Sequence, residues 1–236
     1  MAKRGTVNKS NIKERDTRPI RWRRYPHLFL FACEDGNTEP LYFRTFKKLI
    51  PEETIFLRTV GTGRSSKGVV EQAILERNKL AIEANKDVDE VWAVFDKDDA
   101  DKVPANAIRF IDAFKIAQKE KIGVAYSNEV FELWLLLHLE DVSSAKPIPR
   151  AGIYTRLEAA IKSFETHSLF VYEHGKGKEI DAVINLGNEK KAIERAEKLL
   201  AQHKGMEPID ANPSTTVHVL VQRLRELIDW YSYSPE

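Results

Sequence analysis

The pattern of apolar and polar positions predicts alternating strands and helices over the first 140 residues. Four short apolar runs have the length and composition of buried strands. They cover residues 28–33, 54–60, 90–95 and 122–126. Apolar residues recur at helical spacing over 38–50, 69–85 and 106–119, and in a stretch that opens at Ser127 or Asn128. This alternation predicts a mostly parallel sheet with helices on both faces.

From residue 141 onward the pattern becomes mainly helical. Periodicity predicts helices over 153–164, 188–204 and 213–229, the last with Asn212 as its cap and Pro213 as its first residue. We therefore expect an α/β fold with a sheet of four strands or slightly more. Its expected parts are a basic N-terminal arm (1–26), an α/β core (27–140) and a mainly helical C-terminal extension (141–236).

Composition narrows the class of protein. The chain is 42% hydrophobic and 31% charged, as is usual for a globular protein, and it has no apolar run long enough to span a bilayer. No secretory signal follows the charged N-terminus. A single cysteine, Cys33, excludes an internal disulfide and a cysteine-rich zinc site. We expect a cytoplasmic protein that is not bound to a membrane.

The net charge of +1 is unevenly distributed, because the first 27 residues carry nine Lys or Arg and two acidic residues. Such an arm is attracted to polyanions, and Arg21, Arg23 and Arg24 are candidate nucleic-acid contacts. A tail that only increases solubility is an equally good interpretation.

Two loops add candidate phosphate contacts. Arg64 and Lys67 lie in the glycine-containing loop 61–68, and Lys176 and Lys178 lie in the glycine- and lysine-rich loop 170–178. The first loop lacks the spacing of a P-loop or of a dinucleotide fingerprint. For both loops, a plain solvated connection is the alternative to a phosphate contact.

Acidic residues follow two of the predicted strands. Glu34 comes directly after the first strand, and Asp96 and Asp98 follow the third. If these strands are neighbours in a parallel sheet, the three carboxylates converge at one edge. Hard divalent cations prefer carboxylate oxygens, so the pattern predicts a Mg²⁺ or Mn²⁺ site and chemistry on phosphodiesters. The alternative for Asp96 and Asp98 is an acidic cluster at a helix N-terminus.

Two residues of the fourth helical stretch carry possible chemistry. Glu132 adjoins a strongly apolar run, where a carboxylate needs a metal or a basic side chain as partner. His138 follows six residues later, so it does not share a helix face with Glu132, and a structural role is the better interpretation.

Four motifs, taken in order, resemble the RloB family, which is associated with bacterial phage defence and is similar to the Toprim-type metal-dependent nucleases. They are residues 33–43 (CEDGNTEPLYF), 94–99 (VFDKDD), 127–138 (SNEVFELWLLLH) and 212–215 (NPST). The resemblance covers about residues 27–228. It implies a Toprim-like Rossmannoid fold and, as a partner, an ATPase of the AAA or ABC type. A homo-oligomer is a further expectation.

The resemblance also assigns roles to the acidic residues. Glu34 matches the general acid/base glutamate, and Asp96 and Asp98 match the metal-binding pair. Glu39 and Glu132 match further acidic positions and would supply additional metal ligands or groups that support them.

The chain departs from the family at two positions. Cys33-Glu34-Asp35 replaces the usual Cys-Glu-Gly, which predicts a re-aimed turn at Glu34 and lets Asp35 compete for the metal. In the third motif, Glu129 adds a carboxylate near the start of the helix.

Two hypotheses for the function follow. The first is a Mg²⁺-dependent endonuclease acting on DNA or RNA, tRNA included. The second is a nucleic-acid-binding or regulatory subunit of a defence complex whose acidic site does little chemistry. Two weaker alternatives are a phosphatase of the haloacid-dehalogenase type, whose Asp-x-Asp would follow the first strand, and catalysis by a Cys33 nucleophile. Trp230, Tyr231 and Tyr233 are a candidate partner surface.

Overall fold

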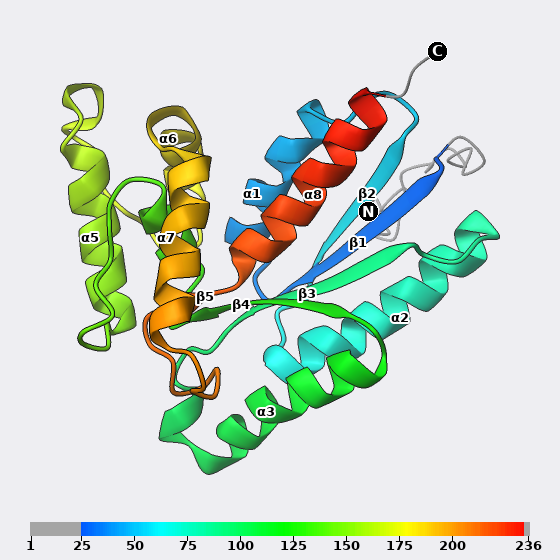
Figure 1. Cartoon of the computed structure of the whole chain (residues 1–236), viewed down its shortest axis with the longest axis horizontal. Coiled ribbons are helices and arrows are strands. Elements are labelled where there is room, and N and C mark those ends of the chain that lie inside the picture. The colour runs from blue at the N-terminus through cyan, green and yellow to red at the C-terminus, as the bar shows by residue number, and fades with distance from the viewer. Residues whose placement is uncertain (1–24, 234–236) are drawn as a thin grey trace, which may run out of the picture.

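A five-stranded sheet forms the centre of the computed structural model, which describes residues 25–233 (Figure 1). Strands β1 (His27–Cys33), β2 (Ile55–Gly61), β3 (Glu90–Asp96) and β4 (Gly123–Asn128) are parallel, and β5 (Ser214–Thr215) pairs antiparallel to β4. The strand order is β2-β1-β3-β4-β5. The predicted α/β class and the mostly parallel sheet are therefore confirmed.

Helices cover both faces of the sheet, as predicted. Helices α2 (Ser66–Ala84) and α3 (Pro104–Lys119) lie on one face, and α1 (Thr38–Thr45) and α8 (Val217–Ser232) lie on the other (Figure 1). Successive side chains of a strand point to opposite faces. Accordingly, the even-numbered residues of β1 pack in the core beneath α2 and α3, and its odd-numbered residues pack in the larger core on the other face.

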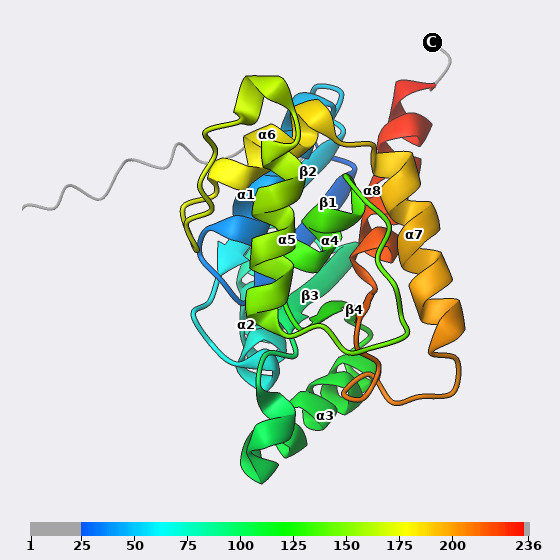
Figure 2. The ribbon, with the colours of Figure 1, turned by 90° about the vertical axis from the view of Figure 1, so that its left-hand side faces the viewer.

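The remaining helices stand beyond the carboxyl edge of the parallel strands (Figure 2). Helix α4 (Glu132–Leu137) is buried along its whole length, because α5 (Arg150–Lys162), α6 (Lys178–Leu186) and α7 (Glu189–Gln202) all contact it. This explains why α4 is apolar on every side after its first residue. Short 3₁₀ helices cover Phe46–Lys48, Ala100–Lys102 and Glu165–His167.

Several predicted element boundaries were wrong. The helix predicted over 213–229 starts at Val217, because Ser214 and Thr215 pair with Asn128 and Ser127. For the same reason, Ser127 and Asn128 do not open a helix but end β4. Helix α6 was not predicted. It has nine residues and lies between Gly177 and Gly187, so its periodic signal is short.

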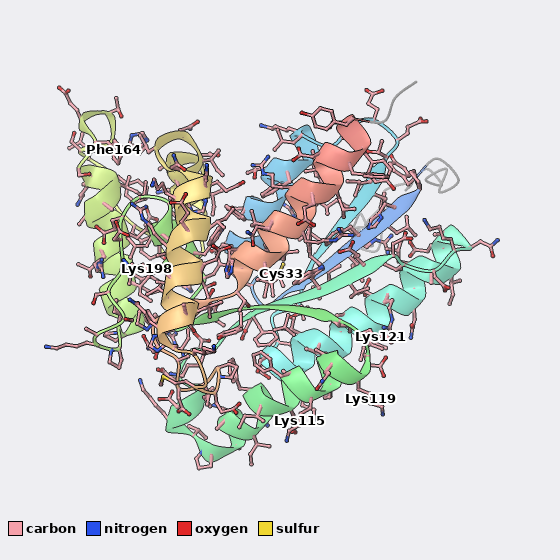
Figure 3. The ribbon with its side chains drawn as sticks, in the orientation of Figure 1. Cys33, Lys115, Lys119, Lys121, Phe164 and Lys198 are labelled. Atoms are coloured by element: carbon pink, nitrogen blue, oxygen red, sulfur yellow. The ribbon has the colours of Figure 1, made fainter. Side chains whose placement is uncertain are left out.

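Two residues considered for chemistry belong to the core. Cys33 is fully buried between the sheet and the helices, and burial raises the pKa of its thiol, which makes it a poor nucleophile (Figure 3). His138 is also buried, and its Nδ1–H donates to the Trp134 carbonyl oxygen at 2.9 Å. Burial lowers the pKa of His138 to about 4, so the ring is neutral.

No helix within residues 25–233 combines the length and the apolar character needed to cross a membrane.

The three aromatic residues proposed as a partner surface differ in exposure. Trp230 and Tyr233 are exposed, whereas Tyr231 is half-buried and packs against His27.

Candidate functional site

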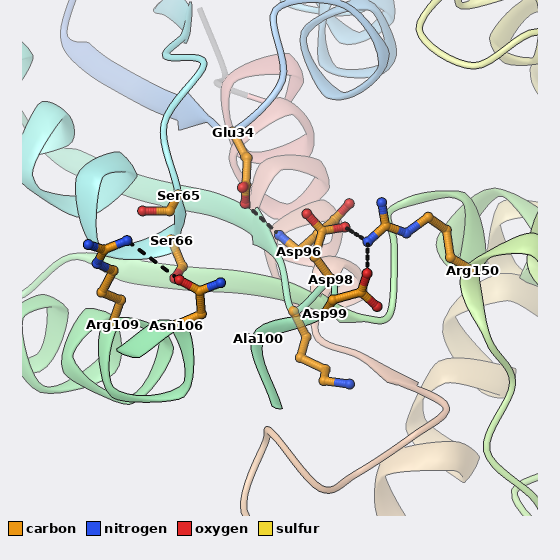
Figure 4. Close-up of a pocket in the computed structure, with 11 residues that line it drawn as sticks. Glu34, Ser65, Ser66, Asp96, Asp98, Asp99, Ala100, Asn106, Arg109 and Arg150 are labelled. Atoms are coloured by element: carbon orange, nitrogen blue, oxygen red, sulfur yellow. Dashed lines mark hydrogen bonds and ion pairs between the residues drawn. The ribbon is translucent and has the colours of Figure 1, made fainter. Parts of the chain in front are cut away.

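Adjacent strands bring the first two predicted acidic residues together. Strands β1 and β3 are neighbours, with Cys33 in register with Val94. One residue later, the Glu34 N–H donates to the Val94 carbonyl oxygen at 2.9 Å, and the Glu34 carboxylate accepts from the Asp96 N–H at 3.1 Å (Figure 4). Glu34 and Asp96 therefore meet at the carboxyl edge of the sheet, as the sequence predicted.

The backbone fixes the Asp-x-Asp segment. Strand β3 ends at Asp96, and Asp98 adopts a left-handed conformation (φ 49°), which aspartate tolerates better than most residues. The N–H groups of Lys97 and Asp98 donate to carbonyl oxygens of Ser127 (2.8 Å) and Glu129 (3.0 Å). In addition, the Asp96 carboxylate accepts from the Phe131 N–H at 3.1 Å. Both aspartates are thus held against the end of β4.

The carboxylates line a cleft with two chambers. The large chamber has a volume of about 370 Å³, and its acidic lining consists of Glu34, Asp35, Glu39, Asp96, Asp98 and Glu132. The small chamber has a volume of about 230 Å³ and shares Glu34, Asp96 and Asp98 with the large one. Strand ends β1 and β3 and helices α1 and α4 therefore deliver all five predicted acidic residues to one cleft.

Burial dominates the electrostatics of this cleft. It raises the pKa of Glu34 and of Glu39 to about 8 in each case. Asp96 is half-buried, and desolvation together with the charges of Glu39 and Glu34 raises the pKa of its carboxyl group as well. One oxygen of Glu39, Oε2, has no hydrogen-bond partner among the described residues. Because desolvation disfavours the ionised form of Glu34, Glu39 and Asp96, their negative charges must be balanced by bound protons or by a cation.

The oxygen donors suit a hard divalent cation, although they do not form a closed cage. Among residues 25–233, no group of three or more His, Cys, Asp and Glu side chains is arranged to hold a metal ion. Mg²⁺ usually keeps several waters and binds through one or two carboxylates together with substrate phosphates. The carboxylate donors of the cleft are therefore compatible with an ion that keeps part of its water shell, and Asp96 and Asp98 as its ligands stay a prediction.

Asp35 has a structural role in the unusual turn after β1. The Asp35 carboxylate accepts from the N–H groups of Gly36 (2.5 Å) and Thr38 (3.3 Å), so it closes the turn into α1. The end of β2 packs tightly against this turn, since a Cβ atom on Gly61 would lie 2.5 Å from the Gly36 Cα. Asp35 also lines the large chamber, so its predicted competition for the metal stays a prediction.

Glu132 has a partner that the sequence did not suggest. The Tyr172 hydroxyl donates to Glu132 Oε1 at 2.5 Å, and His174 Nδ1 lies 3.9 Å from the same oxygen. Glu132 is 3% exposed, and burial raises the pKa of its carboxyl group. Glu132 thus has a tyrosine hydroxyl as a partner, and its predicted part in a metal site stays a prediction.

The predicted nucleic-acid contacts separate into three groups. Arg64 lines the large chamber. Lys67, Lys176 and Lys178 line neither chamber; Lys178 pairs with Glu173, and Lys67 Nζ lies 4.0 Å from Glu71. The arm residues Arg21, Arg23 and Arg24 lie outside the described residues.

The structure adds polar and aromatic residues that the sequence analysis missed. Asn106 and Arg109 of α3 line the small chamber (Figure 4). Arg150 lines both chambers, and its Nη2 lies 3.0 Å from Asp98 Oδ1 and 3.5 Å from Asp99 Oδ2. Tyr154 and His174 line the large chamber. Asn106 and Arg109 come from α3, whereas the C-terminal part of the chain brings Arg150, Tyr154 and His174 to the cleft. No local sequence pattern signals any of these positions.

The added carboxylate Glu129 has a structural role. Its Oε1 accepts from Lys97 Nζ at 2.8 Å and from Asn212 Nδ2 at 3.0 Å, and Lys97 Nζ also lies 2.7 Å from Asp101. Burial alone would lower the pKa of Lys97, but its hydrogen bonds with Asp101 and Glu129 raise it. This buried ion pair ties the segment between Asp96 and Asp98 to the residues before α4 and α8.

We expect Lys97→Met to destabilise the protein by about 3 to 5 kcal/mol, because the substitution leaves Glu129 buried without its cation. Urea unfolding of the variant measures the loss. The double variant Lys97→Met/Glu129→Gln should regain much of it, since no uncompensated charge then remains. Equal stability of the wild type and the single variant would show that the pair contributes little.

Comparison with known proteins gives one match. The chain matches the RloB-like protein family over residues 29–224, a range that contains the parallel sheet except for the first two residues of β1, and all five acidic residues predicted for the site. No curated protein and no solved structure matches it. Because the match spans most of the 236 residues, the chain belongs to the RloB-like protein family.

Proposed function

We propose that this protein is a Mg²⁺- or Mn²⁺-dependent nuclease of the Toprim type that hydrolyses phosphodiester bonds. The observation that carries the proposal is the convergence of Glu34, Asp96 and Asp98 at the carboxyl edge of neighbouring parallel strands. In open α/β sheets, ligands bind at this edge. A divalent ion bound there would polarise the phosphodiester and activate a water molecule.

The chain's own groups have distinct roles in this proposal. Asp96 and Asp98 hold the ion, and the backbone hydrogen bonds that fix them keep their spacing. Glu39 and Glu132 border the same chamber and add negative charge that favours the ion. With a pKa raised by burial to about 8, Glu34 can take up and release a proton near neutral pH, as a general acid/base requires.

A cleavage panel tests the proposal. Single-stranded DNA, double-stranded DNA and total tRNA are incubated with the protein in Mg²⁺, in Mn²⁺ and in chelator. We expect metal-dependent cleavage of at least one substrate, its loss in Glu34→Gln, and its retention in Glu165→Gln, a control substitution at an exposed residue far from the cleft. Cleavage that persists in chelator or in Glu34→Gln would contradict the proposal.

A second candidate is a nucleic-acid-binding or regulatory subunit with a silent acidic site. It is favoured by the guanidinium of Arg150, which already neutralises Asp98, and by the lack of a three-ligand group within residues 25–233. This candidate predicts nucleic-acid binding without cleavage in any metal. Calorimetric titration with Mn²⁺ then distinguishes a site that binds metal from one that does not.

The cellular role is proposed from the family alone. RloB-like membership suggests a cytoplasmic protein that acts in bacterial phage defence, with an ATPase of the AAA or ABC type as partner and with self-association as a further property. Exposed Trp230 and Tyr233 are the candidate contact surface. Copurification with a Trp230→Ala/Tyr233→Ala variant as control tests this surface.

A further inference from the structure

We propose that the large chamber binds one unpaired nucleotide, whose base stacks on an aromatic cluster formed by Tyr154, Tyr172 and His174 while Arg150 pairs with its phosphate. This inference rests on the proposed nuclease function and deepens it, because it names single-stranded nucleic acid, or an unpaired segment of a folded one, as the substrate class.

The three rings of the aromatic cluster contact one another, and Tyr154 and His174 lie at the wall of the large chamber. The centroids of Tyr154 and Tyr172 lie 4.7 Å apart with an interplanar angle of 23°, and those of Tyr154 and His174 lie 5.5 Å apart at 36°. The Tyr172 hydroxyl and His174 Nδ1 are 3.3 Å apart. These contacts limit the freedom of the rings, so little entropy is lost when a base packs on them.

The aromatic cluster adjoins the carboxylates. Tyr154 and His174 line the same chamber as Glu34 and Asp96. Tyr172 contacts the acidic residues of the cleft directly, because its hydroxyl donates a hydrogen bond to Glu132. A base on the aromatic cluster would therefore place its own or the adjacent phosphate among the groups proposed to perform the cleavage.

The exposure of the aromatic cluster points to a ligand. The His174 side chain is 67% exposed although it borders a cleft of buried carboxylates, and Tyr154 and Tyr172 are only partly buried. Aromatic rings beside positive charge are the usual platform for the bases of single strands, because every base has a π face, and Arg64 and Arg150 supply positive charge at this chamber. In a duplex both faces of a base are covered by its neighbours, so only an unpaired base can use this surface.

Arg150 supplies the matching charge. It precedes Tyr154 by four residues on α5, which places both side chains on the same face of the helix, and both line the large chamber. The Arg150 side chain is 37% exposed, so its guanidinium can reach a phosphate while it stays close to Asp98. A chamber of about 370 Å³ has the size of a pocket for one small ligand such as a nucleotide.

The test measures binding, not cleavage. Fluorescence anisotropy is recorded for the full-length protein in chelator and in Ca²⁺ with three labelled probes: a short oligothymidylate, an abasic strand with the same number of phosphates, and a blunt duplex. Oligouridylate is added to compare RNA with DNA. We expect the oligothymidylate to bind about 5- to 100-fold more tightly than the abasic strand, because stacking adds to the phosphate contacts.

Variants distinguish the contribution of the His174 ring from that of the Arg150 charge. His174→Ala should remove most of the preference for bases, whereas His174→Phe should keep it, since phenylalanine keeps an aromatic ring and lacks only the imidazole nitrogens. His167→Ala is the matched control, because His167 lines neither chamber. Arg150→Met should weaken the binding of the oligothymidylate and of the abasic strand by equal factors, and it should reduce the salt dependence of binding.

The outcomes distinguish this inference from the proposed function. Equal affinity for the oligothymidylate and the abasic strand, equal affinity for the duplex, no measurable binding, or an unchanged base preference in His174→Ala would each overturn the stacking site. Metal-dependent cleavage in the presence of those results would leave the nuclease proposal standing. A base preference that His174→Ala removes, in a protein that cuts nothing, would support the stacking site and reject the nuclease.

Discussion

Replacing Asp96 with asparagine is expected to lower metal-dependent cleavage by more than about 100-fold. Even groups that only orient metal ligands typically cost 10- to 100-fold when they are removed, so the loss of a ligand should cost more. The asparagine oxygen can still accept the hydrogen bond from the Phe131 N–H, but the neutral amide cannot balance the charge of the ion.

The fold should persist in this variant. Asp96 is half-buried beside Glu39 and Glu34, and its raised pKa indicates that the ionised form is costly there. We therefore expect the urea midpoint of Asp96→Asn to equal or exceed that of the wild type in chelator. Asp112→Asn, at a site on α3 outside the cleft, is the control for the substitution itself. Cleavage by Asp96→Asn within a few-fold of wild type would exclude Asp96 as a metal ligand.

The sequence was sufficient to predict the sheet and most of its acidic edge. Strand-length apolar runs that end in carboxylates are a strong local signal, and the parallel order then placed Glu34 beside Asp96. The position of Glu39 and Glu132 came from the family resemblance, and the structure shows both at the same chamber. Their role as metal ligands stays a prediction.

The rest of the cleft depends on tertiary contacts that no local pattern reveals. Arg150 follows Pro149 at the start of an ordinary amphipathic helix, and Tyr172 and His174 lie in an irregular segment. Glu179 shows the same limit. It is fully buried at the start of α6, neither of its carboxylate oxygens has a partner within the described residues, and burial raises its pKa to about 7. Nothing in its neighbourhood along the chain suggested burial.

The stability of the protein in chelator should fall as the pH rises from 6.5 to 8. Glu34 and Glu39 have ordinary pKa values of 4.5 and values of about 8 in the fold, so the folded state holds protons that the unfolded state has already released. Their stabilising contribution is complete below pH 4.5 and is lost as the pH rises through 8. For the two groups together, we expect a loss of about 2 to 4 kcal/mol across this window.

The window is chosen so that the core histidine does not interfere. His138 has a pKa lowered to about 4, so its contribution runs in the opposite direction, and stability increases as the pH rises from 4 to 6.5. Above pH 6.5 the contribution of His138 to stability changes little with pH. Urea unfolding at pH 6.5 and at pH 8 measures the slope. The double variant Glu34→Gln/Glu39→Gln should reduce it and leave a smaller slope from Glu179, whose pKa is raised to about 7.

Added Mn²⁺ should reverse this loss, with a larger gain in stability at pH 8 than at pH 6.5, because a metal binds the ionised carboxylates and competes with protons for them. This comparison separates three states of the site without any need for a substrate. A gain that requires Asp96 would indicate an intact metal site, whether or not the protein cuts. A pH dependence of stability without any gain in stability from Mn²⁺ would indicate acidic side chains that bind protons but no metal. If neither a slope nor a gain were seen, the carboxylates would not be desolvated as the structure indicates, and the proposed chemistry would lose its physical basis.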